Sequence, residues 1–213
     1  MRRATSLIPG LVLAFAIFAT LIAAATSAVA AERPDASSAA IPASARTAAA
    51  GFLARYVERG GRVARLDQGG DTASSGQAQG MLVAAAVGDK GLFARIWSWA
   101  RQHLQRPDGL LASRWAGGAI ANPEPASDAD LDAARALLVA AQRFHSAAFR
   151  TAGLRIARAV IAEETVTRGG VRVLVAGPWA RARGIVNPGY WAPRTLTQLQ
   201  AATGDRRFGQ RAS

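Results

Sequence analysis

The segment "ASDADLDAARALLVAAQRF", residues 126–144, is the most informative stretch of the chain. Its alanine-rich apolar part predicts a helix from Ser127 to Phe144. Three carboxyl groups, those of Asp128, Asp130 and Asp132, stand at the start of that helix. Residues four apart share a helix face, so Asp128 and Asp132 lie on one side while Asp130 points elsewhere. The segment therefore predicts a helix whose first turns carry carboxyl groups on two faces.

The residue types alone leave three roles open for this acidic cluster. Carboxylates at a helix start are stabilised by free N–H groups and by the helix dipole, so capping is the ordinary interpretation, with Ser127 as a favoured N-cap residue. Calcium binding needs further ligands, and the glycine and distal glutamate of an EF-hand loop are missing. The third role is catalysis by a carboxyl group. We predict no metal site.

The rest of the chain has the pattern of successive helices. Apolar residues recur at helical spacing, and glycine or polar residues separate the segments. The predicted helices cover residues 44–58, 77–87, 89–104, 147–164 and 193–202, with one short strand-like piece at 171–177. Buried helices alternate with amphipathic ones, which is typical of helical hairpins in an α/α arrangement. The pattern predicts an all-α fold.

The charge balance raises the question of an anionic partner. The chain of 213 residues has a formal net charge of +12. Its arginines are scattered and no nucleic-acid docking module is visible, so we predict no nucleic-acid partner. The lack of cysteine in the sequence excludes disulfides, thiolate metal sites and cysteine nucleophiles. No cofactor is predicted.

The N-terminus has the pattern of a secretory signal. Two arginines precede an apolar run over residues 7–25, and Ala28–Ala30 form a small-residue cleavage site. An uncleaved membrane anchor is the alternative, because the run approaches the length that spans a bilayer. A proline and a glycine inside the run favour cleavage. We therefore expect a signal peptide at residues 1–30 and a secreted or periplasmic protein.

A linker is predicted at residues 31–45, which lack periodicity and are rich in alanine, serine and proline. The remaining residues, 46–213, are then one domain, and they are numerous enough to bury a core.

The segment at 126–144 resembles the signature of glycoside hydrolase family 8, the bacterial endo-β-1,4-glucanases and their relatives. That signature has two aspartates around a small residue, and then an apolar helix that closes on an aromatic residue. The matching positions are Ala126, Ser127, Asp128, Ala129, Asp130, Ala134, Ala136, Leu137, Leu138, Ala140 and Phe144. Ala133 departs, since Ile or Met is usual there. Segments such as "SSGQAQGM" and "NPGYWAP" extend the resemblance over residues 52–208.

The resemblance implies an (α/α)6 toroid of helical hairpins and the hydrolysis of β-1,4-glucan. It assigns a catalytic role to Asp128, and we assign Asp130 to substrate binding. It also places Ser75 where the family has the glutamate that protonates the leaving oxygen. A serine hydroxyl does not supply a proton at neutral pH as a carboxylic acid of raised pKa does. We therefore expect weak or absent hydrolysis, and the alternative is an exported glucan-binding remnant without catalysis.

Four further side chains are candidates for sugar contacts. Trp115, Tyr190 and Trp191 lie in loop-like segments and are candidate platforms for sugar rings. Trp97, in contrast, lies on an amphipathic helix and is predicted to be core. Gln77 is either a ligand for a sugar hydroxyl or a residue at a helix start. The predicted partner is a β-glucan polysaccharide or oligosaccharide.

The number of predicted helices indicates an incomplete toroid. A complete family member has six hairpins, and about half of them are visible here, so the C-terminal part of the domain is expected to be absent. Apolar helix faces without partners then favour self-association through an exposed helical edge.

Overall fold

The computed structural model describes residues 42–209. This part of the chain contains six α-helices: α2 (Ala43–Tyr56), α3 (Ser74–Val87), α4 (Lys90–His103), α5 (Ser127–Arg143), α6 (Ala147–Glu163) and α7 (Pro193–Thr203). Short 3₁₀ turns are η1 (Leu66–Gln68), η2 (Pro178–Ala180), η3 (Pro188–Tyr190) and η4 (Arg206–Phe208). Among the described helices, none combines the length and apolar character needed to cross a membrane. The predicted signal peptide at residues 1–30 lies outside the described residues, so export stays a prediction.

Local capping defines several helix ends. Asp89 caps α4 by accepting a hydrogen bond from Leu92 N at 2.8 Å. Ser146 caps α6 in the same way through Phe149 N. At the other end of a helix, α3 stops at Gly88, whose φ of 87° is a left-handed conformation that glycine adopts readily. The caps explain why α4 and α6 lie within one residue of their predicted bounds.

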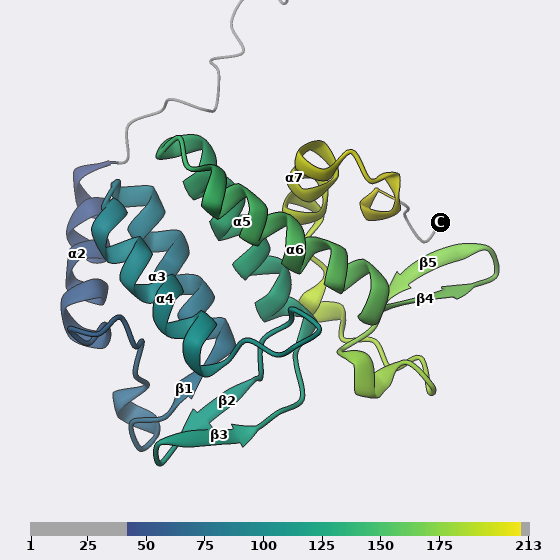
Figure 1. The fold of residues 1–213 in the computed structure, drawn as a ribbon, viewed down its shortest axis with the longest axis horizontal. Helices are drawn as coiled ribbons and strands as arrows, with labels where there is room; N and C mark the ends of the chain where they lie inside the picture. The colour runs from purple at the N-terminus through teal and green to yellow at the C-terminus, as the bar shows by residue number, and fades with distance from the viewer. Residues whose placement is uncertain (1–41, 210–213) are drawn as a thin grey trace, which may run out of the picture. The chain divides into compact units, whose positions relative to one another are not determined.

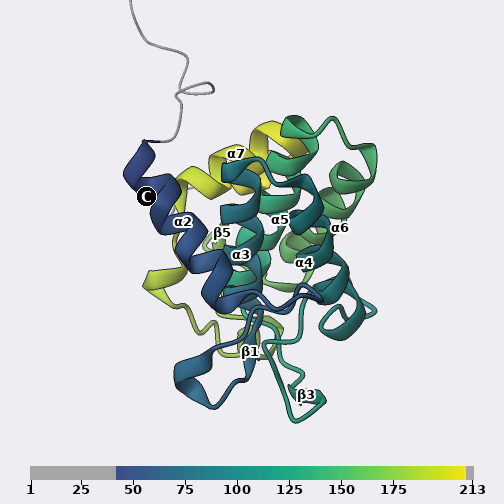
Figure 2. The same cartoon turned by 90° about the vertical axis from the view of Figure 1, so that its left-hand side faces the viewer.

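Helix α5 lies in the middle of the helical assembly. It packs against α3, α6 and α7, while α3 also packs against α2 and α4 (Figures 1 and 2). The core is one apolar cluster whose largest fully buried members include Met81, Phe93, Ile96, Leu104, Leu131, Leu137, Ile156 and Leu199. Trp97 is buried as well, which confirms its prediction as a core residue. α2 contributes no buried residue, so it covers the edge of the assembly.

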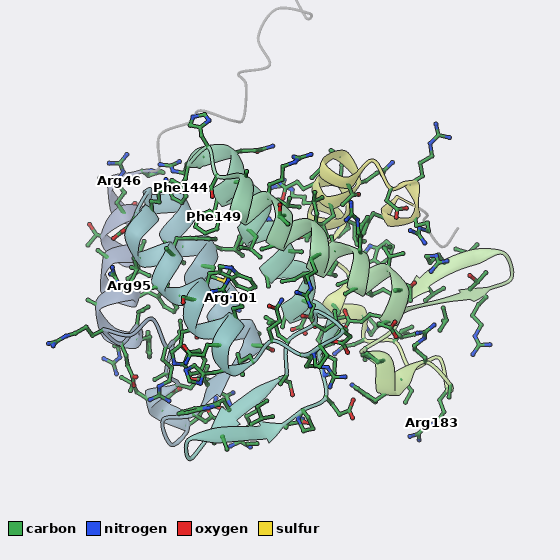
Figure 3. The ribbon with its side chains drawn as sticks, in the orientation of Figure 1. Arg46, Arg95, Arg101, Phe144, Phe149 and Arg183 are labelled. Atoms are coloured by element: carbon green, nitrogen blue, oxygen red, sulfur yellow. The ribbon has the colours of Figure 1, made fainter. Side chains whose placement is uncertain are left out.

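Aromatic side chains pack α4 against the end of α5 and the start of α6. The ring of Phe93 lies 6.0 Å from that of Phe144 and 4.8 Å from that of Phe149 (Figure 3). In the same figure Arg95 and Arg101 are exposed on α4, and Arg183 is exposed on the opposite side of the view. These labelled arginines therefore do not form one basic patch.

Two small antiparallel sheets accompany the helices. The first contains β1 (Thr72–Ala73), β2 (Arg114–Ala116) and β3 (Ala119–Asn122) in that order. The second is a hairpin of β4 (Thr165–Arg168) and β5 (Val171–Leu174). β1 runs directly into α3, and β3 is followed by α5, so the first sheet lies beside the starts of both helices (Figure 1). Of these strands, only β5 falls in the segment predicted to be strand-like. The others were not predicted, because such short strands show no clear period of two.

The differences from the prediction include two helix starts and one N-cap residue. α3 begins at Ser74 rather than Gln77, so Ser75 belongs to the first turn of a helix. The prediction that Ser127 caps α5 is wrong: the N-cap residue is Ala126, and the Ser127 hydroxyl donates instead to the carbonyl oxygen of Val175 at 2.8 Å. α2 begins at Ala43, inside the predicted linker.

Candidate active site

A cleft of about 250 Å³ opens where the starts of α3 and α5 meet the first sheet. Its lining residues are Arg65, Ala73, Ser74, Ser75, Ser113, Arg114, Asn122, Ala126, Asp128, Ala129 and Tyr190. The cleft therefore brings together Ser75 and Asp128, which are far apart in the sequence. Tyr190 reaches it from the η3 turn.

Backbone hydrogen bonds hold the walls of the cleft in place. Ser74 N donates to Ser113 O at 3.0 Å, which ties the start of α3 to the strand segment before β2. Ser113 N donates to Glu124 O at 3.1 Å, which ties the same segment to the approach to α5. Ser127 N donates to Ala176 O at 3.2 Å. The positions of Ser75 and Asp128 are thus set by the segments at 113 and 175–176.

Ser75 is half-buried in the first turn of α3. The N-cap residue of this helix makes no side-chain hydrogen bond, and its first turn holds no acidic residue. Ser75 also borders a second hollow of about 180 Å³, lined by Phe52, Tyr56, Asp67 and others. The hydroxyl therefore lies between two open spaces at the positive end of a helix dipole.

Asp128 is the single carboxyl group among the described residues that line the cleft. The side chain is half-buried, and its Oδ1 has no hydrogen-bond partner. Burial raises the pKa of Asp128, although hydrogen bonds from backbone N–H groups, that of Ala129 included, act in the opposite direction. Such a carboxyl group can both bind a hydroxyl and exchange a proton.

Asp130 points away from the cleft into the core, as its position relative to Asp128 predicts. It is fully buried, and its Oδ1 accepts a hydrogen bond from Leu111 N at 2.9 Å. A side chain in this position makes no direct contact with a substrate in the cleft. The assignment of Asp130 to substrate binding is therefore corrected: it holds the backbone before β2.

Gln77 is likewise part of the framework. It is fully buried, and Val63 N donates to its Oε1 at 2.9 Å. Its Nε2 donates to the carbonyl oxygens of Gly61 at 2.8 Å and Ile96 at 3.0 Å. All of these groups are backbone, so the amide has no free face for a sugar hydroxyl. The prediction that Gln77 is a ligand for a sugar hydroxyl is therefore corrected: its side chain holds the backbone together near the start of α3.

The change Gln77→Met tests this framework role. Methionine has a similar volume but removes the side-chain partner of the Val63 N–H and of the Gly61 carbonyl, and one of the hydrogen bonds to the Ile96 carbonyl. We expect a loss of about 3 kcal/mol in the free energy of unfolding. Chemical denaturation measures it, and Gln79→Met on the exposed face of α3 is the matched control. Unchanged stability together with weakened glucan binding would instead support the ligand role.

An ion-pair cluster forms the rim of the cleft. Asp71 is buried and binds both Arg65, through Nε at 2.7 Å and Nη2 at 2.6 Å, and Arg114, through Nε at 2.5 Å. The hydrogen bond from Arg65, followed by that from Arg114, lowers the pKa of Asp71. Asp71 therefore stays ionised and fixes two arginine side chains beside Ser75. These three residues could not be predicted from the sequence, because nothing in their spacing indicates an ion pair.

The three aromatic candidates lie in different surroundings. Trp115 is half-buried in β2, where its ring packs edge-on against Trp99 at 5.5 Å and under the guanidinium of Arg62 at 5.1 Å. Tyr190 lines the cleft, and burial raises the pKa of its hydroxyl. Trp191 is 45% exposed and borders a separate, small pocket between α6 and α7. Tyr190 is thus the aromatic residue of this set that the structure places beside Asp128.

Glu164 is a buried acid that the sequence did not reveal. It follows α6, is fully buried, and neither of its carboxyl oxygens has a hydrogen-bond partner. Burial, followed by the neighbouring Asp130 and Asp128, raises the pKa of Glu164 to about 10. The pair "EE" at the end of an amphipathic helix has no feature that distinguishes it from a solvated helix end.

Comparisons with known proteins identify the family of the chain. The family model described as "Glycosyl hydrolases family 8" matches residues 21–210. A probable endoglucanase of Novacetimonas hansenii is 33% identical over 166 residues, which cover 75% of this chain and 48% of that protein. An endoglucanase of Pseudomonas fluorescens (strain SBW25) is 29% identical, with 70% of this chain and 40% of that protein covered. The chain thus spans about half the length of the curated relatives it matches.

Solved structures of similar proteins share the fold. An endo-β-1,4-glucanase from Acetobacter xylinum superimposes with a TM-score of 0.75 and 32% identity, over 80% of this chain and 56% of that one. A family 8 endo-β-1,4-glucanase from an Achatina fulica gut metagenomic library has a TM-score of 0.73 and 26% identity, with the same coverage. The helical hairpins of α2–α7 therefore form part of an (α/α)6 arrangement, as predicted. The chain belongs to glycosyl hydrolase family 8.

Proposed function

We propose that the chain binds β-1,4-glucan in the cleft and hydrolyses it slowly, with Asp128 as the reacting carboxyl group. The observation that carries the proposal is the composition of the cleft: it joins Ser75 to Asp128, and Asp128 is the one carboxyl group lining it among the described residues. Support for the substrate comes from relatives and structural neighbours that are named endoglucanases or endo-β-1,4-glucanases.

The expectation of slow hydrolysis follows from the chemistry of glycosidic bonds. Most glycosidases use two carboxyl groups, one as acid and one as base or nucleophile, and an inverting pair stands about 6.5–9.5 Å apart to admit a water molecule. Asp128 can donate a proton when it is protonated or accept one when it is ionised, but it cannot do both at the same moment. The hydroxyl of Ser75 is too weak an acid to fill the second role. One of the two proton transfers is therefore left to solvent.

A second candidate function is glucan binding without turnover. Ser75 favours it directly, because a serine at this position keeps hydrogen bonding to a sugar while it removes proton donation. The two functions share the same cleft and the same ligand, and they differ only in whether the glycosidic bond is cut.

The change Asp128→Asn separates these functions. We measure binding of cellotetraose by calorimetry, and release of shorter sugars by chromatography over long incubation. If Asp128 reacts, Asn should reduce hydrolysis by at least about 10²-fold while changing the affinity little, since Asn retains the hydrogen-bonding shape. Stability should change by only a few tenths of a kcal/mol, because Asn serves nearly as well at a helix start.

Asp132→Asn is the matched control, because Asp132 is half-buried on the same helix and does not line the cleft. It should leave both measurements unchanged. Tight binding with no hydrolysis in the unmodified protein would select the second candidate. Hydrolysis that survives Asp128→Asn would show that the reacting carboxyl group lies elsewhere. Self-association through a helical edge stays a separate prediction.

A further inference from the structure

Beneath the cleft lies a pair of buried carboxyl groups that the proposed chemistry does not use. Asp130 Oδ2 and both carboxyl oxygens of Glu164 are buried without a hydrogen-bond partner in the described part of the chain. The two side chains are neighbours: after burial, the nearby Asp130 carboxyl group is the next cause that raises the pKa of Glu164, and the Asp130 side chain lies within hydrogen-bond reach of it. A buried polar group without a partner is unusual in a folded protein and calls for a physical explanation.

The surroundings of this pair oppose two negative charges. Fully buried Leu111, Leu131 and Val160 belong to the apolar core around it. The titratable groups that act on the pair are the carboxyl groups of Asp128 and Asp108, and Arg106, whose guanidinium is bound to Asp108 at 2.9 Å. No group of carboxyl and imidazole side chains in the described residues is arranged to hold a metal ion. A proton is therefore the group that can neutralise one of the two acids.

We propose that Asp130 and Glu164 share one proton, and that Glu164 acts through this bond as a positioning residue for Asp128 and Ser75. The carboxylic acid of one side chain donates a hydrogen bond to the carboxylate of the other. One unpaired oxygen of each side chain thereby gains a partner. The consequence for catalysis rests on the proposed function; the shared proton itself does not.

The connections of the pair explain how it reaches the cleft. On one side, Asp130 Oδ1 holds Leu111 N, and two residues later the carbonyl of Ser113 accepts the hydrogen bond from Ser74 N at 3.0 Å. This path ends at the start of α3, next to Ser75. A displaced Asp130 therefore moves the wall that carries Ser75.

The second path runs through the backbone of Glu164. Val175 N donates to Glu164 O at 2.9 Å, and the carbonyl of Val175 accepts the hydroxyl of Ser127 at 2.8 Å. This path ends at the start of α5, next to Asp128. The shared proton thus joins the two helix starts from below, at the point where both present their residues to the cleft.

Two variants of Glu164 test the proposal. Glu164→Gln keeps the shape and an N–H donor for Asp130 Oδ2, whereas Glu164→Leu removes the donor. Carbon-13 NMR of labelled Asp and Glu carboxyl groups follows each titration in the full chain. In the unmodified protein we expect one carboxyl group of the pair to remain protonated from pH 5 to pH 8. Asp128 should titrate at the same pH in the Gln variant and at a shifted pH in the Leu variant.

Binding and turnover supply a second readout. Cellotetraose affinity should be retained by Glu164→Gln and fall about tenfold in Glu164→Leu, with any turnover falling further. The control is Glu163→Gln, because Glu163 is the neighbouring residue in the chain, is half-buried rather than fully buried, and pairs with Arg181 at 3.1 Å. It should leave both readouts unchanged.

Two results would overturn the proposal. One is a titration in which both acids of the pair ionise below pH 7, because no proton would then be shared. The other is an Asp128 titration that is identical in the Gln and Leu variants, because Glu164 would then have no positioning role for Asp128. If Glu164→Leu does not fold, the titration of the pair in the unmodified protein and in Glu164→Gln still decides the first point, and Asp130→Asn replaces it for the second. An absence of hydrolysis would count against the proposed function alone, since the NMR readout needs no substrate.

Discussion

The change Ser75→Glu should increase cellotetraose hydrolysis by about 10²-fold, the lower end of the range for a general acid. It supplies a second carboxyl group, in the first turn of α3, to a cleft in which Asp128 is the one carboxyl group among the described lining residues. The gain stays at the lower end for two reasons. The positive end of the helix dipole and the guanidinium of Arg65 both favour the ionised form of the new carboxyl group, and an ionised carboxylate does not donate a proton.

The pH profile of this variant follows from the same forces. Because the pKa of the new carboxyl group is held down, activity should rise as the pH falls from 7 towards 5, where more of the acid is protonated. Ser75→Gln is the control, since glutamine has the same shape and no acidic proton, and it should show no gain. A gain of similar size in Ser75→Gln would mean that shape rather than proton donation limits the reaction. No gain in either variant would mean that a different step or a missing second carboxyl group limits it.

The helices of this chain were more predictable than its strands. α5 was predicted from its apolar periodicity, and the opposed directions of Asp128 and Asp130 followed from helix geometry alone. The start of α3 was missed because serine and glycine are weak helix formers, while in the structure the N–H of Ser74 is stabilised by a carbonyl from the segment before β2. That partner is distant in sequence. The strands β1 to β4 are only two to four residues long, too short for a pattern.

The cleft shows a similar division. Ser75 and Asp128 were found through the resemblance to a family, and the structure places both in one cleft. Gln77 and Asp130 belong to the same sequence segments, yet their side chains point into the core and bind backbone groups. Burial of Glu164 depends on packing against the segment that contains Val175. Such long-range packing leaves no mark in the local sequence, so the framework residues could not be told apart from the residues that face a substrate.

Stability should fall as the pH rises, and the fall should be large. The pKa of Glu164 is about 10 in the folded protein, where burial and the neighbouring Asp130 and Asp128 disfavour its charge. In the unfolded chain a glutamate has a pKa of about 4.3. Between these values the folded state holds a proton that the unfolded state has lost, so unfolding becomes easier as the pH rises. The slope is about 1.4 kcal/mol per pH unit for one proton, or roughly 4 kcal/mol between pH 5 and pH 8.

Carboxyl groups with lowered pKa do not oppose this trend. Asp71, Glu58 and Asp205 have pKa values lowered by hydrogen bonds from arginine. Their contribution to stability is complete above the unfolded pKa of about 4 and is lost only at more acidic pH. Between pH 5 and pH 8 they are ionised in both states and add no slope. The trend in this window is therefore set by the buried acids with raised pKa.

Glu164→Gln should flatten this dependence, because the side chain no longer holds a titrating proton. Urea unfolding at a series of pH values measures it, with Glu163→Gln at the neighbouring half-buried position as the control that keeps the full slope. At pH 8 the Glu164→Gln protein should be more stable than the unmodified protein, and at pH 4 the advantage should disappear, since the unfolded glutamate is then protonated as well. A slope that is the same in both proteins would show that Glu164 is ionised in the folded state, and that some group other than a proton satisfies its buried oxygens.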